Sequence, residues 1–132
     1  MTEPKWDHAD RWRTRKKDFM IEVCRWGLGL GTPYSKNVWN VYVYLYEGHR
    51  LFDRASRCND TSDAYPLIEM HGGITYFRKH FDGNQKITSI QIGCDYAHAW
   101  DESYEEMTTK DEAGPIFHDA QQIIEFLEGA ES

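Results

Sequence analysis

A turn signal flanked by alternating apolar residues is the feature that most constrains how this chain can fold. Asp82-Gly83-Asn84 stands between two stretches in which apolar side chains alternate along the chain. Glycine and asparagine tolerate the positive φ that tight hairpin loops require, and alternation is typical of a strand with one buried face. The sequence therefore predicts a β-hairpin centred near Gly83, with strands over 73–80 and 86–94.

The register of this hairpin follows from its centre. Symmetric pairing about Gly83 would place Ile74 opposite Ile92, so that both strands turn apolar side chains to one face. The same register would place His71 opposite Asp95, with Cα atoms about 4.5–5.5 Å apart. The pattern thus predicts contact between an imidazole and a carboxylate at the open end of the hairpin.

Residues 38–46 form the strongest strand pattern in the chain, because they are dense in β-branched and aromatic side chains. One face would carry the core residues Trp39, Val41, Val43 and Leu45, and the other a ladder of tyrosines, Tyr42, Tyr44 and Tyr46. Such a ladder could stack a nucleotide base. Covering by the N-terminal arm or the C-terminal helix is the favoured interpretation.

The whole chain predicts one α+β domain over 1–132, with an antiparallel sheet of about four strands and a C-terminal helix packed on one face. The two further elements are a strand over 19–26 and a helix over 115–128, where apolar residues recur at helical spacing after Pro115. Residues 1–17 are predicted to form a loosely held arm with one turn of helix near 9–16. At least one of Trp6 and Trp12 should fold back onto the body or bind a partner.

Composition excludes several classes of protein. No apolar run approaches the ~20 residues of a membrane span, and the charged first twenty residues predict a cytoplasmic protein without a secretory signal. Three cysteines without a CxxC pair indicate free thiols and exclude a four-cysteine zinc site. The glycine-rich stretch 27–33 lacks the spacing of a phosphate-binding loop, which favours a flexible connection.

Charge is unevenly distributed along the chain. Residues 1–60 hold 11 basic and 8 acidic side chains, whereas 61–132 hold 4 and 14, and the net charge is −7. An acidic surface repels phosphate backbones and attracts basic patches. Direct binding of nucleic acid is therefore disfavoured unless the basic run over 11–17 mediates it.

Imidazoles and carboxylates gather where the predicted hairpin opens, and we treat them as the candidate site. The metal-ligand or catalytic candidates are His71, Asp95 and His98, with Asp101 as a further ligand, and their N and O donors suit Zn²⁺, Mn²⁺ or Fe²⁺. The wider candidate binding set is His71, Gly72, Gly73, Tyr76, Asp95, His98, Asp101 and Glu102. A structural hydrogen-bond network, with the glycines serving only the turn, stays open as the alternative. Cys94 is expected in the core, not as a nucleophile.

At residues 71–76 (HGGITY) and 92–102 (IGCDYAHAWDE) the chain resembles a family of small proteins carried by bacteriophages and prophages. In that family the signatures HGG-x-T-Y/F and G-x-D-x-A-H-x-x-D recur in this order. The positions that match here are His71, Gly72, Gly73, Thr75, Tyr76, Gly93, Asp95, Ala97, His98 and Asp101. The resemblance implies a phage accessory product acting in the host cytoplasm.

Two functions are carried forward. The first is a phage-type accessory protein that uses its acidic surface to bind and inhibit a host protein or nucleoprotein complex, for example a bacterial defence target, as anti-CRISPR and other anti-defence proteins do. The second is a metal-dependent hydrolase, or a protein that binds or processes a small nucleotide, using His71, Asp95 and His98. A divalent metal is the cofactor that this second function would require.

Overall fold

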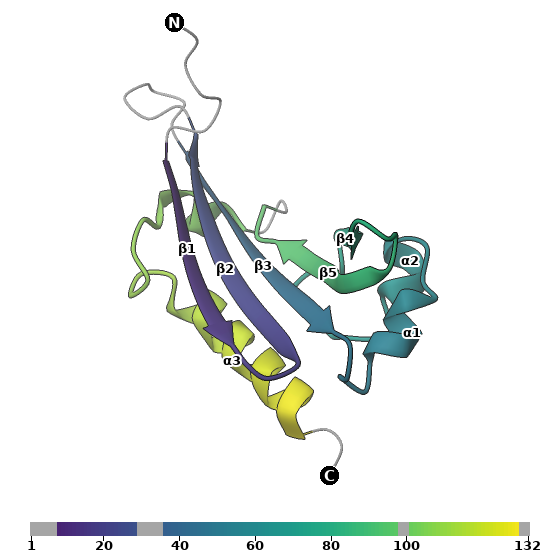
Figure 1. The fold of residues 1–132 in the computed structure, drawn as a ribbon. Coiled ribbons are helices and arrows are strands. Elements are labelled where there is room, and N and C mark those ends of the chain that lie inside the picture. Colours follow the sequence, from purple (N-terminus) through teal and green to yellow (C-terminus); the bar gives the residue numbers. More distant parts are fainter. Residues whose placement is uncertain (1–7, 29–35, 98–100, 130–132) are drawn as a thin grey trace, which may run out of the picture.

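The computed structural model describes residues 8–28, 36–97 and 101–129, and its centre is one antiparallel sheet (Figure 1). The strands are β1 His8–Arg15, β2 Phe19–Leu28, β3 Lys36–Tyr46, β4 Tyr76–Phe81 and β5 Ile87–Asp95. They lie in the order β1-β2-β3-β5-β4, and every neighbouring pair is antiparallel. The predicted α+β class is therefore confirmed, with five strands in place of about four.

The helices lie between and after the strands. Two short helices, α1 Phe52–Ser56 and α2 Thr61–Ala64, join β3 to β4. A 3₁₀ turn, η1 Glu102–Glu106, follows β5, and the chain closes with the long helix α3 Gly114–Gly129. The last helix confirms the prediction for 115–128. Figure 1 shows α3 running along one face of the β1–β3 part of the sheet.

The core lies between this sheet face and the helices. Residues 36–46 alternate strictly between core and partly exposed positions, as the period of a strand requires. The four residues predicted for the core face of β3 are all fully buried, and they share one cluster with the apolar side of α3, Ile116, Ala120, Ile123, Ile124 and Leu127. The tyrosine ladder therefore faces away from α3. Its predicted covering by that helix is wrong.

The N-terminal segment differs from its prediction. Residues 8–15 are not a turn of helix in a loose arm but the edge strand β1, paired with β2 from His8↔Gly27 to Arg15↔Met20. Trp12 points to the core side, where its ring stacks on Trp39 with the centroids 5.7 Å apart. The expectation that one of the two tryptophans folds back is confirmed by Trp12, whereas Trp6 lies outside the described residues. Residues 29–35 of the glycine-rich stretch lie outside them as well.

The hairpin forms where it was expected, but its register is different. Tyr76 pairs with Gly93 and Phe77 with Ile92, so the predicted pairing of Ile74 with Ile92 is wrong. The loop is longer than a symmetric turn about Gly83, because the backbone N–H of Asp82 donates to the carbonyl of Lys86 across it. Within this loop Gln85 has a positive φ of 63°. An irregularity between His80 and Phe81 then shifts the pairing again.

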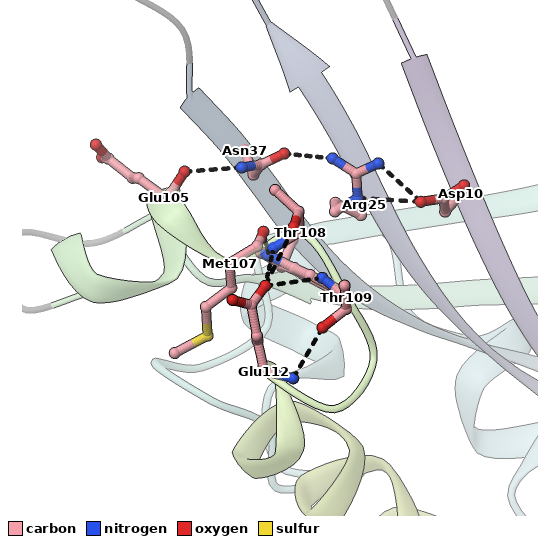
Figure 2. A network of polar contacts seen from close by, with 9 residues as sticks. Asp10, Arg25, Asn37, Glu105, Met107, Thr108, Thr109 and Glu112 are labelled. Carbon is pink, nitrogen blue, oxygen red and sulfur yellow. Dashed lines mark hydrogen bonds and ion pairs between the residues drawn. The ribbon is translucent and has the colours of Figure 1, made fainter.

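A polar network holds η1 and the loop before α3 against the end of the sheet (Figure 2). The guanidinium of the buried Arg25 donates to Asp10 on β1, with Nη2 2.8 Å from Oδ2, and to the side chain of Asn37 on β3. The amide of Asn37 in turn donates to the backbone carbonyl of Glu105, at 2.9 Å. These contacts position the chain that follows β5, which carries Asp101.

Candidate functional site

The candidate site is centred on a histidine and a buried carboxylate. His71, in the loop before β4, directs Nε2 at both carboxylate oxygens of Asp101, at 2.9 and 3.0 Å. Because a carboxylate only accepts hydrogen bonds, Nε2 carries the proton. The side chain of Asp101 is 1% exposed and that of His71 is 20% exposed. The pair thus orients an imidazole whose ring still reaches the surface.

Aromatic rings complete the site. The ring of His71 stacks on that of Tyr96, with centroids 4.0 Å apart and planes 13° apart, and Tyr104 meets Tyr96 edge-on at 5.2 Å. The Tyr96 hydroxyl donates to Asp119 Oδ2 on α3, at 2.7 Å. Burial and this hydrogen bond raise the pKa of Tyr96 well above its ordinary value, so the phenol stays protonated.

Asp95 is not paired directly opposite His71, as the predicted hairpin register required. It pairs with Asn40 on β3, and its carboxylate accepts from the Thr75 hydroxyl at 3.1 Å and from the backbone N–H of Ala97 at 3.1 Å. The partner of His71 is Asp101, which the sequence had offered only as a further ligand. The numbers of paired residues add up to 169 in the structure, as for Tyr76 and Gly93, whereas pairing symmetric about Gly83 requires 166. This shift of three residues is the reason for the correction.

The remaining candidate residues divide between two places and the undescribed part of the chain. Gly72 and Gly73 stand beside His71 with φ of 68° and 89°, so the sharp turn itself requires glycine at both positions. Tyr76 lies on the sheet face opposite α3, where its ring contacts that of Tyr42. His98 and the side chain of Glu102 lie outside the described residues.

A cavity of about 560 Å³ adjoins His71, between the chain at 68–71 and the helix α3. Its lining residues are Ile68, Glu69, Met70, His71, Asp119, Gln122, Ile123 and Phe126. Half of these residues are apolar, and two of the others, Glu69 and Asp119, carry carboxylates. This volume lies within the ~300–1,000 Å³ of ordinary ligand pockets.

The described residues of this site can support acid–base chemistry or binding. A histidine held by a buried carboxylate is suited to accept or give a proton. Among the residues that the structure describes, no three His, Cys, Asp or Glu side chains gather closely enough to hold a metal ion. Burial raises the pKa of Cys94 to about 12, and the three cysteines are free and buried. Cys94 is thus part of the core, as the sequence had indicated.

Searches against protein-family models, curated proteins and solved structures find no match to this chain. Within the described residues, no helix is both long and apolar enough to cross a bilayer.

Sequence reasoning missed Tyr96, Tyr104 and Asp119 as members of the site. Tyr96 stands inside the 92–102 motif, between two candidate residues, so its position was a usable signal. Asp119 is 23 residues further along the chain, on the helix α3. Only the tertiary structure, in which the Tyr96 hydroxyl donates to Asp119, brings the two residues together.

Proposed function

We propose that this protein is a non-enzymatic binding protein that inhibits a host component, in the manner of a phage accessory protein, by occupying a basic surface of its partner. The observation that supports this most directly is the cavity beside His71. It combines an apolar wall from Ile68, Ile123 and Phe126 with the carboxylates of Glu69 and Asp119. A lysine or arginine side chain, which has an aliphatic stem and a cationic head, matches that combination.

The surroundings of the cavity favour the same class of partner. From residue 101 to 129 the chain has nine acidic side chains and one basic one, Lys110. Most of them project from η1, the loop after it and α3, and they extend the negative potential beyond the cavity. The ring of Phe126 makes a cation–π contact within the chain, since the guanidinium carbon of Arg50 lies 5.1 Å from the ring centroid. Charge complementarity of this kind speeds association and selects basic partners.

Reversing one charge at the cavity is expected to weaken binding. Glu69 is exposed, so Glu69→Lys should leave the fold intact and lower partner affinity at least about tenfold, because close interfacial charge pairs contribute about 1.5 kcal/mol or more. The measurement is capture from bacterial lysate on immobilised protein, at low salt and at about 1 M salt, where the screening length falls to about 3 Å.

Asp53→Lys is the matched control, because it changes the net charge equally at an exposed position on α1. A partner retained by the wild type and the control but lost by Glu69→Lys supports the proposal. No retained partner at low salt, or equal retention by both variants, contradicts it.

An enzymatic function is the second candidate. It is supported by the hydrogen bonds between the His71 imidazole and the buried Asp101 carboxylate, an arrangement suited to proton transfer. The metal-dependent hydrolase or nucleotide-processing enzyme predicted from the sequence would use His71, Asp95 and His98, and the described contact of His71 with Asp101 would orient its imidazole. Protein purified without chelator should then contain close to one equivalent of zinc, manganese or iron, and His71→Gln should lose it. Metal analysis by mass spectrometry checks this. Metal below about a tenth of an equivalent in the wild type would rule out the metal enzyme.

A further inference from the structure

The sheet face opposite α3, here called the open sheet face, carries aromatic side chains from three strands. Tyr42 and Tyr44 come from β3, Tyr76 and His80 from β4, and Trp26 from β2, all partly exposed. Their pairing registers place them on the same side of the sheet, because directly opposed residues share a face. No described helix or strand packs over this side, and the core cluster lies on the other.

The rings on the open sheet face are held in fixed positions. Tyr42 meets Tyr76 edge-on with centroids 5.4 Å apart, and Gly93, which pairs with both, leaves room for the Tyr42 ring above its backbone. Tyr44 lies nearly parallel to the ring of His80, with centroids 6.1 Å and planes 25° apart. The aromatic surface is therefore ordered before any ligand arrives, which lowers the entropy cost of binding.

Cationic side chains border this aromatic surface on both sides. By strand alternation and register the open sheet face carries Arg11, Arg13 and Arg15 on β1, Lys36 on β3 and Arg78 on β4. Its carboxylates are Glu22 and Asp95, and Glu22 is almost buried under Arg13, whose Nε lies 2.5 Å from Oε2. The face is thus positively charged on a chain whose net charge is −7.

A shallow cavity of about 280 Å³ lies where the arginines meet the tyrosines. Arg11, Arg13, Cys24, Tyr42, Tyr44 and Tyr76 are among its lining residues. The guanidinium of Arg11 also stands 4.7 Å from the ring centroid of Trp26. A hollow just below the usual size of drug-like pockets, with aromatic and guanidinium planes around it, suits a flat group the size of a nucleobase.

We propose that the open sheet face binds single-stranded nucleic acid. Bases stack on the tyrosines of β3 and β4, and phosphates pair with the arginines of β1 and with Arg78. Stacking on exposed aromatic side chains together with a cationic track is the general means by which proteins hold single strands. Aliphatic side chains are few here, since Met20 is 7% exposed and Val38 is half-buried, so a protein partner would find little aliphatic surface to bury.

This inference is independent of the acidic cavity, which lies on the α3 side of the sheet. The acidic second half of the chain had disfavoured nucleic acid unless the basic run over 11–17 mediates binding, and Arg11, Arg13 and Arg15 of that run lie on the open sheet face. The acidic side chains of residues 101–129 and the arginines of β1 belong to different faces. A protein with an acidic face and a basic aromatic face could bind both the protein and the nucleic acid of a nucleoprotein complex.

The test is fluorescence anisotropy with a labelled, mixed-sequence 12-nucleotide DNA strand, and with the RNA of the same sequence, at about 50 and 200 mM salt. The wild type is expected to bind at the lower salt and to weaken at the higher. Tyr44→Ala should reduce affinity about 5- to 150-fold, the range for losing one stacked base. Arg78→Gln, at an exposed position, should lower the salt slope by about 0.7, the value for one phosphate contact on a single strand.

The matched controls are Tyr65→Ala and Arg54→Gln, which remove the same kinds of side chain from exposed positions elsewhere. Circular dichroism should show that Tyr44→Ala is folded, and Arg78→Gln provides an independent test if it is not. Absence of binding to both oligonucleotides at low salt would overturn the proposal. So would equal affinities for the face variants and the controls, or a protein partner that Tyr44→Ala loses while no oligonucleotide binds.

Discussion

Trp39→Ala is expected to lower the free energy of unfolding by about 3–5 kcal/mol, the usual cost of truncating a buried tryptophan. Trp39 is fully buried at the centre of β3. Its ring stacks on Trp12 and meets Phe117 of α3 edge-on at 6.3 Å, and its Nε1–H donates to the carbonyl of Met107 at 3.2 Å. One side chain therefore joins the edge strand, the long helix and the loop before it.

Urea unfolding followed by circular dichroism checks this value. Tyr65→Ala is the control, because that ring is 63% exposed and its loss should change stability by less than about 0.5 kcal/mol. Trp39→Phe should fall between the two, since it keeps the ring contacts and loses the N–H. A loss below about 1 kcal/mol for Trp39→Ala would contradict the packing described here.

His71→Ala is expected to cost about 1–3 kcal/mol through the buried carboxylate that loses a donor, and about 0.5–1.5 kcal/mol more through the lost ring contact with Tyr96. The Asp101 side chain is 1% exposed, so water does not readily replace the imidazole. If the pair is only a structural network, any binding or catalytic activity should fall in proportion to the folded fraction.

A double-mutant cycle with Asp101→Asn separates the two interpretations. A coupling energy of about 1 kcal/mol or more in urea unfolding shows that the contact stabilises the fold. A site that serves function instead predicts lost activity at an unchanged or even raised melting temperature, because functional sites commonly trade stability for activity. Coupling near zero together with unchanged function would show that His71 and Asp101 do not interact in solution.

Local patterns in the sequence determined the elements of this protein. The alternation at 38–46 predicted which side chains of β3 are buried, and the helical spacing after Pro115 predicted the apolar face of α3. These patterns can be read from the sequence because buried side chains recur at every second residue of a strand and about every 3.6 residues of a helix. Strand β1 was missed for the same reason, since a charged edge strand shows little apolar alternation.

Contacts between distant segments were decided by the tertiary structure. The positive φ of Gln85 and the irregularity after His80 set the hairpin register, and a turn signal in the sequence does not specify either. In that register Asp95 is not paired directly opposite His71, while the network from Arg25 to Glu105 positioned the chain that carries Asp101. The sequence alone thus identified the residue types of the site. Pairing among them depends on a register in which a small shift moves every partner, so it required the folded sheet.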